Sequence, residues 1–162
     1  MIKICMVGSG YVGLVSGACM ADFGHTVWCV DINEARIDGL RRGVIPFYEP
    51  GLDLLVKKNV QAQRLFFTTS LQEGMAQADV VFIAVQTPQS ESGEADLTYV
   101  LQVGEQIGRL MDGYKVIVTK STVPVGTARR LERLIRGAQA RPVPFDMASN
   151  PEFLREGSSI ED

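Results

Sequence analysis

Several kinds of residue and segment are scarce or missing in this 162-residue sequence. It has one histidine and three cysteines, with no CxxC pair, so it offers neither a metal site nor a disulfide framework. Its net charge of −3 leaves no basic excess to attract nucleic acid or an acidic membrane surface. No apolar run is long enough to span a membrane. What remains is a globular domain that must hold any phosphate by local groups.

The three thiols, Cys5, Cys19 and Cys29, lie in apolar segments where burial is expected. An odd number of buried thiols is typical of a reducing compartment. The first residues, with Lys3 and an apolar run, share some features with an export signal, but three glycines interrupt the run. We therefore expect a cytoplasmic protein.

Segments with β and helical character alternate along the chain, with no internal repeat. This alternation predicts one α/β domain of Rossmann type, in which a doubly wound, mainly parallel six-stranded sheet has helices on both faces. The expected strands are residues 2–7, 26–30, 65–68, 80–85, 115–119 and 145–148. The expected helices are residues 11–23, 33–42, 53–59, 71–77, 97–111 and 125–136.

The first expected strand ends in a glycine-rich loop, GSGYVG, at residues 8–13. In this pattern Gly8 permits a tight turn, Gly10 lets a pyrophosphate approach the backbone, and Gly13 lets the helix pack closely against the strand. The N-terminus of the following helix supplies N–H groups and partial positive charge. The loop therefore predicts a dinucleotide site.

An acidic residue is expected about twenty residues after such a loop, and Asp31 ends the second expected strand. Its carboxylate is suited to accept both ribose hydroxyls and to repel a 2′-phosphate, which favours NAD over NADP. Arg36 leaves other possibilities open, because it is placed to cover the adenine, to pair with Asp31 or to tolerate a phosphate. The alternative interpretation is a glycine turn and a strand-end acid with no ligand.

Three later segments also follow strands: residues 85–88, 120–127 and 148–157. Ligands of open α/β sheets bind at the carboxyl ends of the strands, so these segments are expected to meet in one site beside the dinucleotide. Each has an ordinary structural explanation when taken alone, as a turn, a helix cap or an acid favoured early in a helix.

The last of these segments, ASNPEFLREG, predicts a helix start. The Asn150 side chain is suited to cap a helix, and Pro151 fits the first helical position. Glu152 and Glu156 are four residues apart, so a helix would place both carboxylates on one face.

Six ordered motifs spread over the chain resemble those of the nucleotide-sugar dehydrogenases, the UDP-glucose/GDP-mannose dehydrogenase family. The forms FYEPGL and KSTVPVGT are closer to the UDP-glucose branch of this family than to its GDP-mannose branch. Gln86 departs from the pattern, since the family often has glycine there. The motifs are GSGYVGLVSG, VDIN, FYEPGL, FIAVQTP, TKSTVPVGT and SNPEFLREG.

The resemblance implies that residues 1–162 are the NAD-binding domain of an enzyme that oxidises the C6 alcohol of a nucleotide sugar to a carboxylate with two NAD. It also implies a catalytic cysteine beyond residue 162, after a central helix and within a C-terminal nucleotide-sugar-binding domain. Cys5, Cys19 and Cys29 match none of that cysteine's surroundings. We expect the chain alone to be inactive and the whole enzyme to be a homo-oligomer.

Roles carried over from the matching motifs make Glu152 and Thr122 the candidate catalytic residues. In the family the catalytic cysteine forms a thioester with the oxidised sugar, and water then cleaves it. Glu152 would serve the water or proton transfer of this hydrolytic step, and Thr122 would position that water. Glu49 of FYEPGL matches too, but it is equally suited to begin a helix and is left out of the site. The implied substrate residues are Glu152, Phe153, Leu154, Arg155 and Glu156. The implied NAD residues are Gly8, Gly10, Tyr11, Val12, Gly13, Asp31, Arg36, Thr87, Ser121 and Glu156.

UDP-glucose is the nucleotide sugar that the motifs favour. GDP-mannose or another nucleotide sugar is the alternative within the family. A free-standing NAD-binding or redox-sensing module is the alternative from a different class of protein.

Overall fold

The computed structural model describes all residues from 1 to 162 and contains six strands and six helices. Each of these elements was expected from the sequence, and the expected ends differ from the observed ones by at most two residues. The strands are β1 Lys3–Val7, β2 Thr26–Val30, β3 Leu65–Thr68, β4 Val80–Ile83, β5 Lys115–Thr119 and β6 Phe145–Ser149. The helices are α1 Tyr11–Asp22, α2 Glu34–Arg41, α3 Leu52–Gln61, α4 Leu71–Met75, α5 Thr98–Leu110 and α6 Thr127–Ala138.

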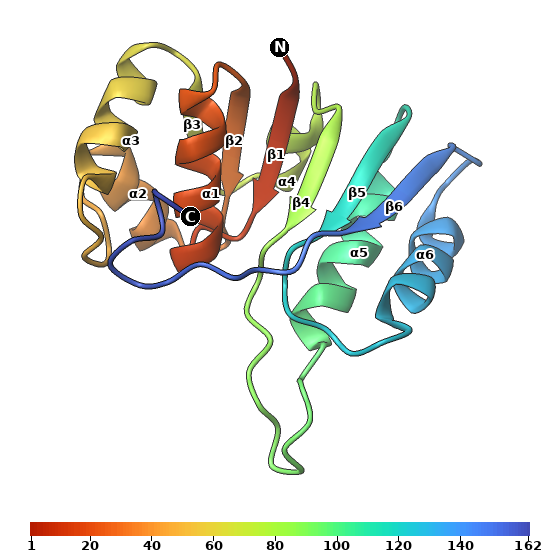
Figure 1. Cartoon of the computed structure of the whole chain (residues 1–162). Helices are drawn as coiled ribbons and strands as arrows, with labels where there is room; N and C mark the ends of the chain where they lie inside the picture. The colour runs from red at the N-terminus through yellow and green to blue at the C-terminus, as the bar shows by residue number, and fades with distance from the viewer.

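The six strands form one sheet in the order β3-β2-β1-β4-β5-β6, and every neighbouring pair is parallel (Figure 1). The chain begins at β1 in the middle, builds outward to β3, returns to β4 beside β1, and builds outward to β6. The predicted Rossmann-type fold is confirmed. The strand order reverses between β1 and β4, and the carboxyl ends at such a reversal are where doubly wound sheets bind ligands.

Both faces of the sheet are covered by helices, because side chains alternate between the faces along each strand. In β1, Ile4 and Met6 join a buried cluster with α1, α2 and α3. Cys5 and Val7 join a second cluster with α4, α5 and α6. Burial on both faces explains why the strands are nearly continuous apolar runs. None of the helices combines the length and the apolarity that crossing a membrane requires.

The segment after β6 contradicts the sequence prediction. No helix begins at Asn150, and residues 150–162 contain turns but neither helix nor strand. The Asn150 N–H donates to the Thr119 carbonyl oxygen at 2.9 Å, and its side-chain oxygen accepts from Lys120 Nζ at 3.1 Å instead of capping a helix. Glu152 and Glu156 therefore do not share a helical face.

Long-range packing explains this departure. Residues 150–160, here called the strap, run from β6 back along the carboxyl ends of the strands towards α1 (Figure 1). Leu154 and Ile160 of the strap pack against the cluster that α1, α2 and α3 share. A helix rises only about 1.5 Å per residue, so an extended path is needed to bring these side chains there. Tertiary packing outweighs the local helix signal.

Two of the three cysteines lie in the core. Cys5 and Cys29 are fully buried, Cys19 is half-buried, and none forms a disulfide. Burial raises the pKa of Cys5 to about 12, and burial also raises the pKa of Cys29. The thiolate is the reactive form of cysteine. Both thiols are therefore protected from reaction, because reagents cannot reach them and because the raised pKa keeps them protonated.

We predict that iodoacetamide at about pH 8 labels Cys19 alone in the native chain, because only that thiol is reached by solvent. Peptide mass spectrometry after a short pulse measures the label. The same chain unfolded in urea is the control, in which all three thiols react. Labelling of Cys5 or Cys29 in the native chain as fast as Cys19 would contradict the central place of β1 and β2.

Candidate functional site

The glycines of the loop between β1 and α1 are set by the backbone that surrounds them. Gly8 has φ of +103°, and a Cβ there would lie 2.6 Å from the Ala84 carbonyl oxygen. A Cβ on Gly13 would lie 1.8 Å from the Gly8 carbonyl oxygen, so only glycine lets α1 start so close to the loop. A Cβ on Gly10 would meet nothing within 4 Å. Open space therefore lies over Gly10, at the mouth of the helix.

The first turn of α1 has unsatisfied donors. The backbone N–H groups of Tyr11, Val12 and Gly13 have no acceptor within the protein, and the N-cap residue Gly10 has no side chain to supply one. The first turn of α1 also has no acidic residue, whereas α2 is capped by the side chain of Asn33. Free N–H groups and the helix dipole favour an anion at this position. The residues present thus fit a dinucleotide diphosphate.

Asp31 lies directly beside the loop. Its Oδ2 accepts from the Ser9 N–H at 2.9 Å and from the Arg36 guanidinium at 2.8 Å, and its Oδ1 accepts from the Asn33 N–H at 2.9 Å. Of the positions that the sequence left open for Arg36, the structure has the ion pair with Asp31. An ionised carboxylate has about four acceptor positions, so these three donors leave capacity for a ribose hydroxyl.

The loops after β4 and β5 are hydrogen-bonded to each other. Ser121 Oγ donates to the Val85 carbonyl oxygen at 2.6 Å, and Thr87 Oγ1 donates to the Thr122 carbonyl oxygen at 3.1 Å. Neither Ser121 nor Thr122 caps α6, because its N-cap residue is Gly126 and no side chain bonds there. The ordinary explanation of this segment as a helix cap is therefore wrong.

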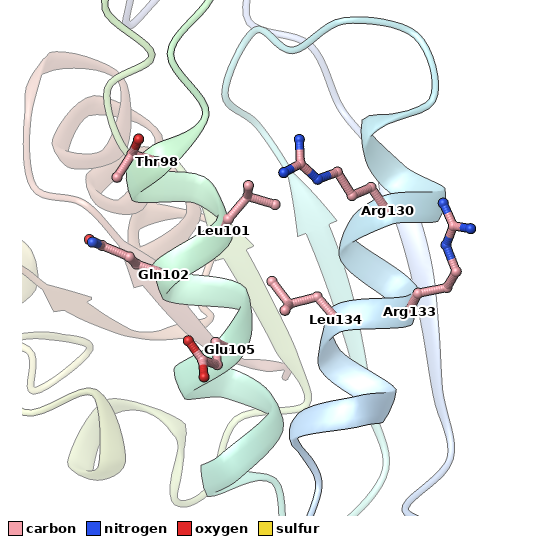
Figure 2. Close-up of a pocket in the computed structure, with 7 residues that line it drawn as sticks. All are labelled: Thr98, Leu101, Gln102, Glu105, Arg130, Arg133 and Leu134. Atoms are coloured by element: carbon pink, nitrogen blue, oxygen red, sulfur yellow. The ribbon is translucent and has the colours of Figure 1, made fainter.

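Two hollows bear on where a ligand would lie. A hollow of about 260 Å³ at the ends of β5 and β6 is lined by Ser121, Thr122, the start of α6 and Pro151. A larger one of about 580 Å³ lies between α5 and α6, where Leu101 and Leu134 flank a gap with two arginines on its α6 side (Figure 2). The larger hollow contains none of the loop residues at the carboxyl ends, so we assign the smaller one to the candidate site. The larger one is lined by Thr98, Leu101, Gln102, Glu105, Arg130, Arg133 and Leu134.

The strap brings the predicted substrate residues to the same edge in different environments. Glu152 Oε1 accepts from the Leu154 N–H at 2.6 Å, so its side chain folds back on the strap. Leu154 packs into the core, and Arg155 pairs with Asp162. Glu156 is exposed, and Phe153 is 84% exposed.

Sequence reasoning missed two residues at this edge. Ser9 Oγ is buried and has no hydrogen-bond partner. Lys120 is buried, and its ammonium contacts only the Asn150 amide; burial lowers the pKa of Lys120, while the nearby Glu152 carboxylate acts in the opposite direction. A lysine directly after an apolar strand was a visible signal, but the environment of Ser9 depends on three-dimensional packing alone.

Comparison with known proteins identifies the fold's family. Residues 2–162 match the family described as "UDP-glucose/GDP-mannose dehydrogenase family, NAD binding domain". The chain belongs to this family. The family expected from the six motifs is confirmed, and NAD is confirmed as the cofactor of the domain.

Curated relatives of this NAD-binding domain include two bacterial UDP-glucose 6-dehydrogenases. The chain is 54% identical to TuaD of Bacillus subtilis over all of its length and 54% identical to the enzyme of Rhizobium meliloti over 99% of its length. It covers 35% and 37% of those proteins, so it spans about a third of their length.

Solved structures of the family superimpose closely on this domain. A UDP-glucose dehydrogenase from Pyrobaculum islandicum gives a TM-score of 0.94 at 40% identity, covering 100% of this chain and 38% of its own. A ternary complex of GDP-mannose dehydrogenase from Pseudomonas aeruginosa gives a TM-score of 0.95 at 36% identity, and the match covers 99% of this chain and 38% of that enzyme.

We predict that Gly10→Ala weakens NAD binding by about tenfold or more, or about 1.4 kcal/mol, because the methyl group would occupy the space over the free N–H groups. Calorimetric titration measures the affinity. The melting temperature should change little, since Gly10 has φ of −72° and open space around it.

Gly137→Ala is the matched control for this substitution. Gly137 lies on α6, also has open space around it, and is far from the loop in the sequence. Unchanged NAD affinity in Gly10→Ala would contradict the position given to the diphosphate.

Proposed function

We propose that this domain serves a UDP-glucose 6-dehydrogenase, which oxidises the C6 alcohol of UDP-glucose to the carboxylate of UDP-glucuronate. The observation that carries the proposal is the meeting of the open loop, Asp31 and the strap at the carboxyl ends of the strands. NAD⁺ bound there supplies the hydride acceptor, and two are reduced for each sugar oxidised.

In this proposal the cofactor is held mainly by backbone. The free N–H groups of residues 11–13 bind the diphosphate, and Asp31 accepts from the adenosine ribose. Arg36 holds the Asp31 side chain in place through its ion pair. Thr87 and Ser121 hold the β4 and β5 loops together and so shape the far half of the cofactor site.

The strap supplies the groups that meet the nucleotide sugar. Phe153 to Glu156 would line the sugar nucleotide, partly through backbone, and Glu156 would also lie near the nicotinamide. Glu152 takes the proton of the water in the hydrolytic step, and Thr122 positions that water. Lys120 lies close enough to Glu152 for the two side chains to interact electrostatically.

UDP-glucose is preferred to GDP-mannose as the substrate. Identity to the two UDP-glucose 6-dehydrogenases is 54%, against 36% to the GDP-mannose dehydrogenase. GDP-mannose is the second candidate, because the GDP-mannose enzyme has the same fold at a TM-score of 0.95. A homo-oligomeric, cytoplasmic enzyme is part of the proposal, and three free thiols, two of them buried, support that compartment.

We predict that the chain binds NAD about tenfold or more tightly than NADP, because Asp31 accepts from the ribose and repels a 2′-phosphate. Asp31→Ala should reduce this preference, because it weakens the binding of NAD and removes the repulsion of the NADP 2′-phosphate. Asp38→Ala, which removes an exposed acid from the neighbouring helix α2, is the control. A preference for NADP, or an unchanged ratio in Asp31→Ala, would be incompatible with this role.

We also predict that the 162-residue chain with UDP-glucose and NAD⁺ gives no steady rise in NADH absorbance. Cys5 and Cys29 are buried in the core, and Cys19 lies near the C-terminal end of α1, eight residues after Tyr11 at the mouth of the helix, so none is placed at that mouth to act as the thiol nucleophile. TuaD assayed alongside is the positive control. Steady turnover by the chain alone would refute the need for a thiol outside it.

A further inference from the structure

A buried acid outside the predicted site holds the strap. Glu49 lies in the loop between α2 and α3 and is only 4% exposed. Its Oε2 accepts from the Gly157 N–H at 2.8 Å, and its Oε1 accepts from the Ser159 N–H at 2.8 Å. These partners are 108 and 110 residues away in the sequence. The interpretation of Glu49 as a helix-start residue is wrong, since α3 begins after the N-cap residue Gly51.

The same carboxylate contacts the helix that carries the dinucleotide loop. The Tyr11 hydroxyl donates to Glu49 Oε2 at 2.6 Å, and it also contacts Ser159 Oγ. Tyr11 is the first residue of α1 and one of the three residues with a free N–H group. One buried side chain therefore joins the mouth of α1 to the end of the strap.

Glu49 has no cationic partner. Its charge is satisfied by one hydroxyl and two backbone N–H groups. A buried carboxylate that lost these donors would be costly, and the N–H groups would in turn lose their acceptor. Because two of the three donors belong to the strap, the contacts of Glu49 fix the strap more than they fix the sheet.

We propose that Glu49 is a positioning residue that holds the strap, and with it Glu152 to Glu156, over the dinucleotide loop. The importance of the strap position for catalysis rests on the proposed function. That Glu49 holds the strap in this position does not depend on it. At its other end the strap is held by the hydrogen bond from Lys120 to Asn150. Glu49 therefore sets the position of the second half of the strap, which contains Gly157 and Ser159.

Glu49→Gln tests the proposal in the full 162-residue chain without any ligand. The amide keeps the size of the side chain, but its NH2 group cannot accept from an N–H, so Gly157 or Ser159 loses its acceptor. We expect these two amides to exchange with deuterium about tenfold or more faster in NMR measurements, while the amides of β1 and β4 keep their rates.

Two further variants keep the test sharp. Tyr11→Phe removes the hydroxyl and leaves both backbone hydrogen bonds to Glu49. It should therefore increase the exchange rate of the Ser159 amide by less than Glu49→Gln does. Glu132→Gln, which breaks an exposed ion pair on α6, is the control and should change neither strap amide. Unchanged exchange at Gly157 and Ser159 in Glu49→Gln, or equal acceleration of the β1 and β4 amides, would overturn the proposal.

The pH dependence of hydrogen-exchange protection at Gly157 and Ser159 tests whether the charge of Glu49, and not packing alone, holds the strap. The Tyr11 hydroxyl, followed by the Gly157 and Ser159 amides, lowers the pKa of Glu49 below its ordinary value of 4.5. A lowered pKa means that protection is complete above about pH 4.5 and is lost as the pH falls through the lowered value. Glu49→Gln should abolish this dependence.

Tyr11 and Asp162 are the titratable groups that act on Glu49, and Asp162 is itself paired with Arg155. Asp162→Asn should therefore leave a dependence on Glu49 in place. A pH profile that disappears in Asp162→Asn and persists in Glu49→Gln would overturn the assignment to Glu49. Failure of the wild-type chain to bind NAD would instead refute the proposed function, and it would leave the role of Glu49 in holding the strap unaffected.

Discussion

The free backbone N–H groups at the mouth of α1 are the feature on which the site depends. Three consecutive donors there have no acceptor in the protein, and leaving such groups unpaired is unfavourable wherever water is excluded. Their freedom follows from the glycines, because Gly13 brings α1 against the loop and Gly10 leaves the helix without a side-chain cap. Asp31 completes the arrangement by accepting from the Ser9 N–H of the same loop.

The strap adds a second constraint, because it joins the two halves of the domain. It leaves β6, the outermost strand on one side, and ends against the cluster of α1, α2 and α3 on the other. Residues late in the chain thereby lie over a loop formed early in the chain. The buried contacts of Lys120 and Glu49 at its two ends suit a segment whose side chains, in the proposed function, are placed accurately beside a cofactor.

The sequence predicted what local patterns determine. Apolar runs gave all six strands, and the spacing of Gly8, Gly10, Gly13 and Asp31 gave the loop and its acid, because each depends on neighbours along the chain. The helix at Asn150 was wrong because Asn-Pro-Glu is a local signal, whereas Leu154 and Ile160 respond to a distant core. The role of Glu49 was out of reach for the same reason, since its strap partners lie more than a hundred residues away. The pairing of Arg36 with Asp31 was one of several possibilities that spacing alone could not separate.

The most direct measurement is an NMR titration of the isotope-labelled chain with NAD, following every backbone amide. If the free N–H groups bind the diphosphate, the largest shifts should fall on Tyr11, Val12 and Gly13, with smaller ones near Asp31. Shifts centred on the hollow between α5 and α6, with residues 11–13 unchanged, would contradict the account.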